Sequence, residues 1–388
     1  MVPLKKKVIV GLSGGVDSSV SALLLLREGY DVEAMYMRNW DSATNNDRLG
    51  NPDLAEPVCP QESDYADALK VADKLGIRLH RHDFIQEYWD DVFTHFLKEY
   101  AGGRTPNPDI LCNKHIKFKT FSEVAQGLGA DLIAMGHYAR VTHGESGTHL
   151  LRGVDPEKDQ TYFLCQLTQA QLKNVLFPIG HLRKSEVRQI AREAGLPTAE
   201  KKDSTGICFI GERRFAQFLA NYLPARPGDI VTDAGIVLGR HDGLMNHTIG
   251  QRKGLHIGGL QEFGKAPWFV VGKDLEKNRL IVAQGIDHDL LQSDSCILED
   301  INWIPAGLPP EELACTAKFR YRQADVPVIV TFEPDGHARV RFQTDVRAVT
   351  PGQECVFYQG EECLGGGTIT AVFKAGVPRG IAIKEDHP

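Results

Sequence analysis

Two of the eight cysteines, Cys112 and Cys208, stand in sequence contexts that favour thiol chemistry. Cys112 follows a loop rich in proline and glycine and directly precedes a predicted helix whose early residues include Lys114 and Lys117. A helix N-terminus and nearby cations both lower the pKa of a thiol and so favour the nucleophilic thiolate. Asp109, just before Cys112, is suited to act as an acid or a base. Cys112 is therefore a predicted nucleophile.

Cys208 lies in a second loop of small residues, with Lys201 and Lys202 upstream and a predicted helix from Glu212 onwards. The other six cysteines lie in apolar or β-like stretches or in an ordinary loop, and we expect them to be packing residues. No pair has C-x-x-C spacing, so a zinc ribbon or a thioredoxin-type centre is not indicated. No local pattern brings Cys112 and Cys208 together, and a buried structural thiol stays the alternative for each.

A glycine-rich turn near the N-terminus predicts an anion site. Residues 8–20 read VIVGLSGGVDSSV, which indicates a short strand, a glycine turn and the start of a helix. Gly11, Gly14 and Gly15 let backbone N–H groups approach an anion closely, and the following helix directs its positive dipole end to the same point. Ser13 and Ser18 add hydroxyl donors. We call residues 11–18 the glycine loop.

Asp17 is the unusual member of the glycine loop, because a carboxylate repels phosphate unless a cation bridges the two. Its presence predicts Mg²⁺ beside bound phosphate. No lysine follows the glycines, so the pattern is neither G-x-x-x-x-G-K-[ST] nor G-x-G-x-x-G. It resembles the SGGxDS signature of the PP-loop ATP pyrophosphatases, which implies cleavage of ATP between its α and β phosphates. The alternative is a serine- and glycine-rich turn that only joins a strand to a helix.

The elements around the glycine loop predict a parallel sheet. Strands are expected at residues 8–10, 31–37, 77–80 and 131–135, helices at 62–75, 84–100 and 114–128, and an irregular loop at 38–60. This alternation indicates a parallel sheet with helices on both faces, and such sheets bind ligands at the carboxyl ends of their strands. Gly11, Met37 and Gly136 lie at those ends and are predicted contacts of one nucleotide.

The second half of the chain predicts β structure. Helices are expected at 184–194 and 212–222, a Pro/Gly linker at 224–228, and strands at 230–231, 236–238, 268–271 and 280–282, the last two paired across a turn at 275–278. Short strands at 315–320, 326–332, 339–342, 356–358 and 368–373 are typical of a small barrel. We expect an α/β catalytic domain over residues 1–215, a small central mixed domain over 216–292 and a C-terminal β-barrel over 293–388.

Composition and charge narrow the functional classes. The 388 residues are 42% hydrophobic with a net charge of −7, which argues against a general nucleic-acid binder. The apolar runs are too short to span a membrane, and no signal peptide precedes the first strand, so a cytoplasmic protein is expected.

Basic residues are nevertheless grouped along the sequence, despite the negative net charge. If residues 315–320 continue as a strand, Lys318, Arg320 and Arg322 share one face that suits a phosphate backbone; the alternative is an ordinary solvated face.

Segments along the whole chain resemble the tRNA-specific 2-thiouridylase family of the PP-loop superfamily. In order, they are SGGVDSS, GGRTPNPDILCNKHIKF (102–118), GHYARV (136–141), KDQTYFL (158–164), DSTGICFIG (203–211), TIGQRKGL (248–255), KFRYRQ (318–323) and TPGQECVFY (350–358). The resemblance implies a PP-loop domain, a central domain that recognises tRNA, and a β-barrel. It implies ATP-dependent adenylation of the C2 oxygen of wobble uridine 34, followed by sulfur transfer, giving 2-thiouridine, AMP and pyrophosphate.

The resemblance also implies roles for individual residues. Cys208 would carry a persulfide, Cys112 would either liberate sulfide from it or resolve it as a transient Cys112–Cys208 disulfide, and Asp109 would assist proton transfer. The implied ATP contacts are Gly11, Leu12, Ser13, Gly14, Gly15, Val16, Asp17, Ser18, Met37 and Gly136. The implied contacts of the target base are Asn107, Pro108, Asp109 and His137, and those of the rest of the tRNA are Lys158, Asp159, Gln160, Arg320, Tyr321 and Gln353.

The implied cofactors are ATP and Mg²⁺, and the implied partners are a sulfur-relay protein or cysteine desulfurase and the tRNAs for lysine, glutamate and glutamine. The chain is expected to be a monomer. Elementary chemistry agrees with two cysteines at one site, because sulfur at the oxidation level of zero needs two electrons from a second thiol. The target base must also leave its stack to reach them. Two alternatives stay open: a PP-loop ligase or synthetase of small molecules, and a tRNA-binding redox switch whose ATP site is regulatory.

Overall fold

The computed structural model describes residues 5–52, 60–145, 147–203, 210, 213–258 and 263–381. Its N-terminal part is a five-stranded parallel sheet in the order β3-β2-β1-β4-β7. The strands are β1 (Lys7–Gly11), β2 (Asp31–Arg38), β3 (Leu79–Asp83), β4 (Leu132–Ala134) and β7 (Val175–Leu176). The expected α/β class is confirmed. Strand β3 begins two residues later than expected, because Gly76 (φ +67°) and Ile77 still close the preceding helix through hydrogen bonds to Asp73 and Ala72.

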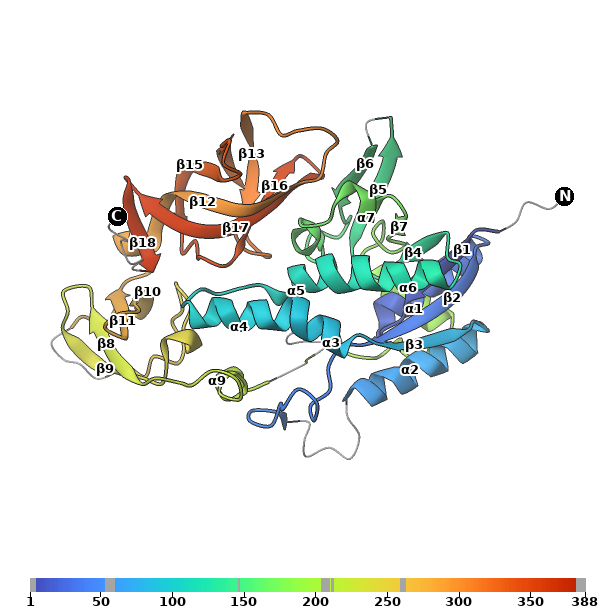
Figure 1. The fold of residues 1–388 in the computed structure, drawn as a ribbon, viewed down its shortest axis with the longest axis horizontal. Coiled ribbons are helices and arrows are strands. Elements are labelled where there is room, and N and C mark those ends of the chain that lie inside the picture. The colour runs from blue at the N-terminus through green and yellow to red at the C-terminus, as the bar shows by residue number, and fades with distance from the viewer. Residues whose placement is uncertain are drawn as a thin grey trace.

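Helices cover both faces of this sheet (Figure 1). Val8 and Val10 of β1 pack on one face with α1 (Val16–Arg27) and α2 (Pro60–Leu75), and α8 (Lys184–Glu193) packs against α1. Ile9 points to the other face, where it joins a core of aromatic side chains from residues 84–121. Alternating side chains of a β-strand face opposite ways, so a fully apolar run is what a strand covered on both faces requires.

The second face is covered by two helical runs that each contain a π-helical stretch. The first consists of α3 (Ile85–Tyr88), Trp89–Phe93 and α4 (Thr94–Ala101), and the second of α5 (Pro108–Leu111), Cys112–Thr120 and α6 (Phe121–Gly127). The second run begins at Pro108 and not at residue 114 as expected. Asn107 explains the difference, because its side chain caps the helix by accepting from the Asp109 N–H, and Pro108 suits the first helical position.

A hairpin that the sequence pattern did not indicate follows β4. It consists of β5 (Ala139–Gly144) and β6 (Gly147–Arg152), and β6 also pairs with the barrel strand β17 (Glu362–Lys374). Two short helices, Thr161–Leu164 and α7 (Gln169–Leu172), lie between this hairpin and β7.

The central region begins with α9 (Phe215–Leu219), which is shorter than expected within the described residues. It contains β8 (Gly228–Thr232), β9 (Val237–His241), β10 (Trp268–Asp274) and β11 (Arg279–Gln284), with further short helices at Leu244–Asn246 and Asp289–Leu291. Strands β10 and β11 form the expected antiparallel pair, and β8 joins β11 in parallel.

The C-terminal strands close into the expected barrel. The strands are β12 (Gln292–Trp303), β13 (Glu312–Lys318), β14 (Val326–Phe332), β15 (Ala338–Arg347), β16 (Glu354–Gln359) and β17. They pair in the order β12-β15-β14-β13-β16-β17, and β17 pairs back to β12. The last strand, β18 (Val377–Ile381), pairs with both β17 and β10 and so connects the barrel to the central strands. Figure 1 shows the barrel, in orange and red, beside the two helical runs that contain α4, α5 and α6.

One expectation about the barrel is wrong. Strand β13 ends at Lys318, and the chain then turns at residues 319–322, so Lys318, Arg320 and Arg322 do not share one strand face. The guanidinium of Arg320 instead folds inward, donating to the carbonyl oxygens of Ile249 and Ala348 at 3.0 and 2.7 Å. Within the described residues, none of the helices is long and apolar enough to cross a membrane.

Candidate active site

The glycine loop joins β1 to α1 and approaches α2 closely. Gly14 has φ +74°, and a Cβ atom there would lie 2.2 Å from the Asp64 carbonyl oxygen of α2. The Ser18 hydroxyl closes the loop, 3.2 Å from the Ser13 amide nitrogen and 3.1 Å from the Gly15 carbonyl oxygen. Helix α1 therefore begins directly behind a tight turn, where its first backbone N–H groups are available to an anion.

The three strand-end residues predicted to share a ligand come together at the glycine loop. A Cβ on Gly11 would lie 2.7 Å from the Met135 sulfur and 3.5 Å from the Met37 methyl carbon. A Cβ on Gly136 would lie 2.9 Å from the Ser18 amide nitrogen. At Gly136 the close neighbour is backbone, so only glycine fits there, whereas at Gly11 the methionine side chains pack directly on the backbone; together with Met37 the two glycines border one side of the glycine loop.

Asp17 has a cationic partner that the sequence analysis did not identify. The Lys184 ammonium, at the start of α8, donates to both carboxylate oxygens of Asp17 at 2.8 Å. The Tyr138 hydroxyl donates to the same carboxylate at 2.8 Å, and burial, followed by the negative charge of Asp17, raises the Tyr138 pKa, so Tyr138 remains a donor. No sequence pattern links residues 17, 138 and 184, and the packing of both Tyr138 and α8 against α1 brings them together.

Asp203 is a second carboxylate bonded to Lys184. It accepts from Lys184, Lys158 and Arg188 at 2.8, 2.9 and 2.7 Å. Partial burial by itself would raise the pKa of Asp203, but the hydrogen bonds and charges of Lys184 and Lys158 lower it to about 2. Asp203 is therefore ionised across the physiological pH range.

Cys112 lies inside a helical run rather than in front of one. Because the run begins at Pro108, the sequence-based placement of Cys112 immediately before a helix is wrong by about one turn. Its side chain is fully buried and belongs to the same apolar cluster as Met37 and Met135. The thiol is thus part of the core that covers the second face of the parallel sheet.

Cys208 lies outside the described residues, so its distance from Cys112 and the predicted transient disulfide are not tested. The nearby Lys201, expected to support a thiolate, bonds to Asp64 and Asp67 of α2 at 2.7 Å each. Its charge is thereby compensated by carboxylates next to the glycine loop.

The loop that leads to Asn107 is held by both C-terminal regions. The Lys273 ammonium on β10 donates to the Gly103 carbonyl oxygen at 2.7 Å. The Gln353 side-chain amide donates to the Thr105 carbonyl oxygen at 2.6 Å, and the Thr105 N–H donates to the Pro351 carbonyl oxygen. Gln353, predicted to contact tRNA, therefore helps to position the connection between α4 and α5 ahead of Asp109.

His137 is a buried neutral ring. Its imidazole packs between Phe118 and Phe177, with ring centroids 5.7 and 5.9 Å away, and its Nδ1 atom has no hydrogen-bond partner. Burial, and then the charge of Lys117, lowers the His137 pKa well below the usual value.

The predicted tRNA-contacting residues of the 158–160 segment fall into two groups. The Asp159 carboxylate is buried and accepts from the Thr161 hydroxyl, and Gln160 accepts from the Tyr138 N–H at 2.9 Å, so both shape the local backbone. Lys158 and Tyr321 lie side by side at the surface, where the Tyr321 hydroxyl is 3.4 Å from the Lys158 carbonyl oxygen. These two residues come from distant parts of the sequence and are brought together by the fold, while their contact with tRNA stays a prediction.

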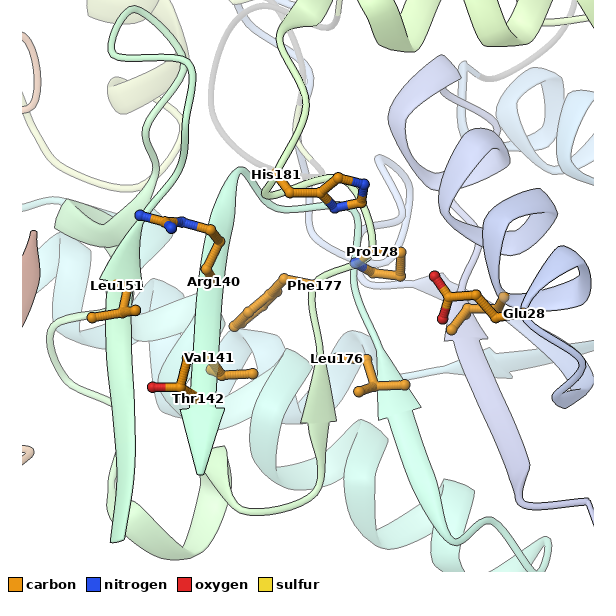
Figure 2. A pocket seen from close by; sticks show the side chains of 10 residues that line it. Glu28, Arg140, Val141, Thr142, Leu151, Leu176, Phe177, Pro178 and His181 are labelled. Carbon is orange, nitrogen blue, oxygen red and sulfur yellow. The ribbon is translucent and has the colours of Figure 1, made fainter. Parts of the chain in front are cut away.

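A separate pocket of about 300 Å³ lies between α1, β7 and the β5–β6 hairpin, and Phe177, which packs on His137, forms part of its wall. Figure 2 shows Phe177 and Leu176 in its wall, with Arg140, His181 and Glu28 around it. Glu28 follows the C-terminal end of α1, about 18 Å along the helix from the glycine loop. None of the predicted site residues lines this pocket.

The fold and the site define a class of protein: a nucleotide-loop α/β domain followed by two β domains. Three family descriptions match consecutive parts of the chain, "tRNA methyl transferase HUP domain" over residues 6–212, "tRNA methyl transferase PRC-barrel domain" over 216–284 and "Aminomethyltransferase beta-barrel domain" over 293–369.

Relatives named tRNA-specific 2-thiouridylase MnmA match nearly the whole chain. The protein of Acholeplasma laidlawii is 57% identical over 376 residues, which is 97% of this chain and 99% of the relative. That of Geobacillus kaustophilus, named MnmA 2, is 57% identical over 374 residues, 96% of this chain and 97% of the relative, and that of Lacticaseibacillus paracasei is 56% identical over 368 residues, 95% of each chain. The chain belongs to the tRNA-specific 2-thiouridylase MnmA family, and the resemblance predicted from its motifs is confirmed.

Proposed function

We propose that this protein is a tRNA-uridine 2-sulfurtransferase that converts wobble uridine 34 to 2-thiouridine. The structural observation that supports this function best is the glycine loop, where Gly11, Gly136 and Met37 gather at the strand ends in front of α1. Cys112 lies in the apolar core that also contains Met37 and Met135. The proposed chemistry requires its sulfur and the adenylating nucleotide to meet at one base.

The first step uses the glycine loop. The C2 oxygen of uridine attacks the α-phosphorus of ATP, pyrophosphate leaves, and the adenylated oxygen becomes part of a good leaving group, AMP. Backbone N–H groups at the start of α1 and the Ser13 and Ser18 hydroxyls hold the phosphates, while Gly11, Leu12, Gly14, Gly15, Val16, Met37 and Gly136 shape the nucleotide site.

Asp17 suits a divalent cation shared with the phosphates, because Mg²⁺ is usually held by one or two carboxylates together with substrate phosphate. Such an ion would neutralise charge on the phosphates. Across the described ranges, no group of three or more His, Cys, Asp or Glu side chains forms a protein-only metal site. Asp17 is therefore the residue we assign to Mg²⁺, through Oδ2, since Oδ1 accepts from both Lys184 and Tyr138, with the substrate supplying the other charged ligands.

The second step transfers sulfur from a persulfide on Cys208. In one route its terminal sulfur attacks C2 and expels AMP; Cys112 then attacks the Cys208 sulfur, the electron pair of the broken S–S bond stays on the sulfur at C2, and a Cys112–Cys208 disulfide forms. In the other route Cys112 attacks first and releases hydrosulfide, which attacks C2. Asp109 exchanges protons in either route, and the disulfide must be reduced before the next turnover.

The remaining predicted residues bind RNA in this proposal. Asn107, Pro108 and Asp109 contact the extruded base, and the neutral His137 lies beside it. Lys158, Asp159, Gln160, Arg320, Tyr321 and Gln353 contact or position the rest of the tRNA. We further propose catalytic, tRNA-recognition and barrel domains over residues 1–215, 216–292 and 293–388, a monomer in the cytoplasm, tRNAs for lysine, glutamate and glutamine as acceptors, and a sulfur-relay protein or cysteine desulfurase as donor.

The direct test is thiolation in vitro. The purified protein is incubated with unmodified lysine-, glutamate- or glutamine-accepting tRNA, ATP, Mg²⁺ and a cysteine desulfurase with cysteine, and the nucleosides are analysed by mass spectrometry. We expect 2-thiouridine at position 34 together with AMP and pyrophosphate. Nucleosides that stay unmodified while a small-molecule acyl or amide product accumulates would support a ligase instead, and ATP binding without any turnover would support the redox switch.

A further inference from the structure

Lys184 is placed between the glycine loop and Asp203. It is the first residue of α8, and its side chain is mostly buried, with 14% of its surface exposed. The ammonium bonds to both oxygens of Asp17 at 2.8 Å and to Asp203 at 2.8 Å, and it lies 5.8 Å from the centre of the Tyr138 ring. One cation thus serves two carboxylates that come from opposite ends of the α/β domain.

The two carboxylates differ in how strongly each depends on Lys184. Asp203 also accepts from Lys158 at 2.9 Å and from Arg188 at 2.7 Å, so two cations remain if Lys184 moves away. The bonds described for Asp17 are those from Lys184 and from the neutral hydroxyl of Tyr138. Of the two contacts, the one with Asp203 is therefore the less costly to lose.

We propose that Lys184 is a phosphate-binding residue of the nucleotide site and that Asp203 competes with phosphate for it. This inference rests on the proposed ATP site. Bound polyphosphate adds negative charge next to Asp17, and Lys184 is the ammonium already within bonding distance of that carboxylate. When nucleotide binds, Lys184 keeps Asp17, exchanges Asp203 for a phosphate oxygen, and leaves Asp203 to Lys158 and Arg188. Asp203 thereby lowers the affinity for nucleotide.

The competition for Lys184 also links the nucleotide site to tRNA, because Lys158, which bonds to Asp203, is proposed to contact tRNA. Release of Lys184 from Asp203 makes Asp203 depend more on Lys158 and Arg188, so occupancy of the nucleotide site and the electrostatic environment of a tRNA-contacting lysine are linked through one carboxylate. By thermodynamic reciprocity, neutralisation of Lys158 by RNA phosphate would in turn affect nucleotide binding.

The test measures binding of α,β-methylene ATP with Mg²⁺ by calorimetry on the full chain, without tRNA or sulfur donor. We expect Lys184→Met to weaken binding by about 10-fold or more, the usual value of a lost hydrogen bond to a charged group, and Lys184→Arg to retain most of it. We expect Asp203→Asn to tighten binding, by roughly 2- to 5-fold for a partly exposed pair, and Asp203→Glu to resemble the unaltered protein.

The direction in which Asp203→Asn changes the nucleotide affinity distinguishes competition for Lys184 from a purely structural role of Asp203. If Asp203 only stabilises the fold, its loss weakens nucleotide binding or leaves it unchanged, and either result overturns the proposal. In a Lys184→Met background, Asp203→Asn should tighten nucleotide binding less, because the ammonium for which Asp203 competes is absent. A full-sized effect in that background would also contradict the competition.

Arg192→Gln is the matched control. Arg192 lies on the same helix and pairs with Glu200 in an exposed ion pair away from Asp17, so nucleotide binding should not change. Thermal unfolding of every variant separates loss of the fold from loss of the site. If the unaltered protein itself fails to bind the nucleotide, the proposed ATP site fails; if it binds normally and the variants do not follow the expected signs, only the competition fails.

Discussion

The Lys273 ammonium, buried with 1% of the residue exposed, donates a 2.7 Å hydrogen bond to the Gly103 carbonyl oxygen. This bond connects β10 of the central region to the loop that leads into the helix of Asp109 and Cys112. Leu275, just beyond β10, packs on the same glycine, where a Cβ atom would lie 2.8 Å from its methyl carbon. The position of the helix that carries the proposed nucleophile thus depends on a residue distant in the sequence.

Replacement of Lys273 should change the pH dependence of stability. Burial lowers the Lys273 pKa from 10.5 to about 8, so between these values the unfolded chain binds more protons than the folded chain. Stability contributed by this residue therefore rises with pH across that window, by on the order of 3 kcal/mol. In Lys273→Met this rise should be missing when urea unfolding is compared at pH 7.5 and pH 10.

The same variant should thiolate tRNA more slowly, by roughly 10- to 100-fold, because small displacements of a nucleophile are costly. Lys277→Met is the control. Lys277 is exposed, and its ammonium lies 3.9 Å from a carboxylate oxygen of Asp274, which is a weak surface ion pair. Equal rates for Lys273→Met and the control would show that the loop holds its position without this bond.

Glu354 should give the opposite pH dependence. Its carboxyl is buried in the barrel wall, and burial raises its pKa from 4.5 to about 7, despite the hydrogen bond from Thr368. The folded chain then binds more protons than the unfolded chain between these values, so stability falls as the pH rises from 4.5 to 7, by on the order of 3 kcal/mol. Glu354→Gln should remove most of this loss, measured by urea unfolding at pH 5 and pH 8, whereas the exposed Glu361→Gln should not. An undiminished decline in Glu354→Gln would place the titrating group elsewhere.

The proposed two-cysteine chemistry predicts that Cys112→Ser and Cys208→Ser each reduce 2-thiouridine formation by more than about 100-fold, because neither route balances without both sulfurs. Pyrophosphate release and tRNA binding should persist, since neither uses a thiol. Cys315→Ser is the control, as Cys315 is a partly exposed cysteine on β13 in the barrel. Full thiolation by either single variant would eliminate the mechanism.

Gly14 and Gly29 provide a matched pair for the glycine loop. Both have positive φ values, +74° and +88°, so alanine costs backbone strain of about 1 kcal/mol at either position. Only at Gly14 would the added Cβ collide, 2.2 Å from the Asp64 carbonyl oxygen, whereas at Gly29 nothing lies within 4 Å. Gly14→Ala should abolish measurable ATP binding, and Gly29→Ala should lower stability alone. Similar ATP affinities for the two variants would show that the glycine loop does not bind the nucleotide.

Lys158 should contribute to tRNA affinity through phosphate. Lys158→Met is expected to weaken binding at low salt and to reduce the slope of log K against log salt by about 0.7 to 0.9, the share of one phosphate contact. Filter binding over a series of salt concentrations measures this slope. An unchanged slope would mean that Lys158 serves only its ion pair with Asp203.

The sequence alone determined the elements whose signals are local. The β-branched run before SGGVDS specified β1, the glycine loop and α1, and the alternation of strands and helices specified the parallel sheet whose carboxyl ends gather Gly11, Met37 and Gly136. The turn-separated strands after residue 293 specified a barrel. In each case neighbouring residues carry the information, because turn geometry, capping and side-chain periodicity act over a few residues.

The tertiary structure decided the long-range contacts that position these elements relative to one another. The Lys184 bonds to Asp17 and Asp203, the Lys273 bond to Gly103 and the Gln353 bond to Thr105 join residues far apart in the chain, and no spacing rule predicts them. Even the start of the Cys112 helix was missed, because a two-proline loop indicated irregular structure while the Asn107 cap and the packing of Ile110 and Cys112 in the core favoured a helix. Burial and long-range ion pairs depend on the completed fold, and for that reason these contacts could not be predicted from the sequence.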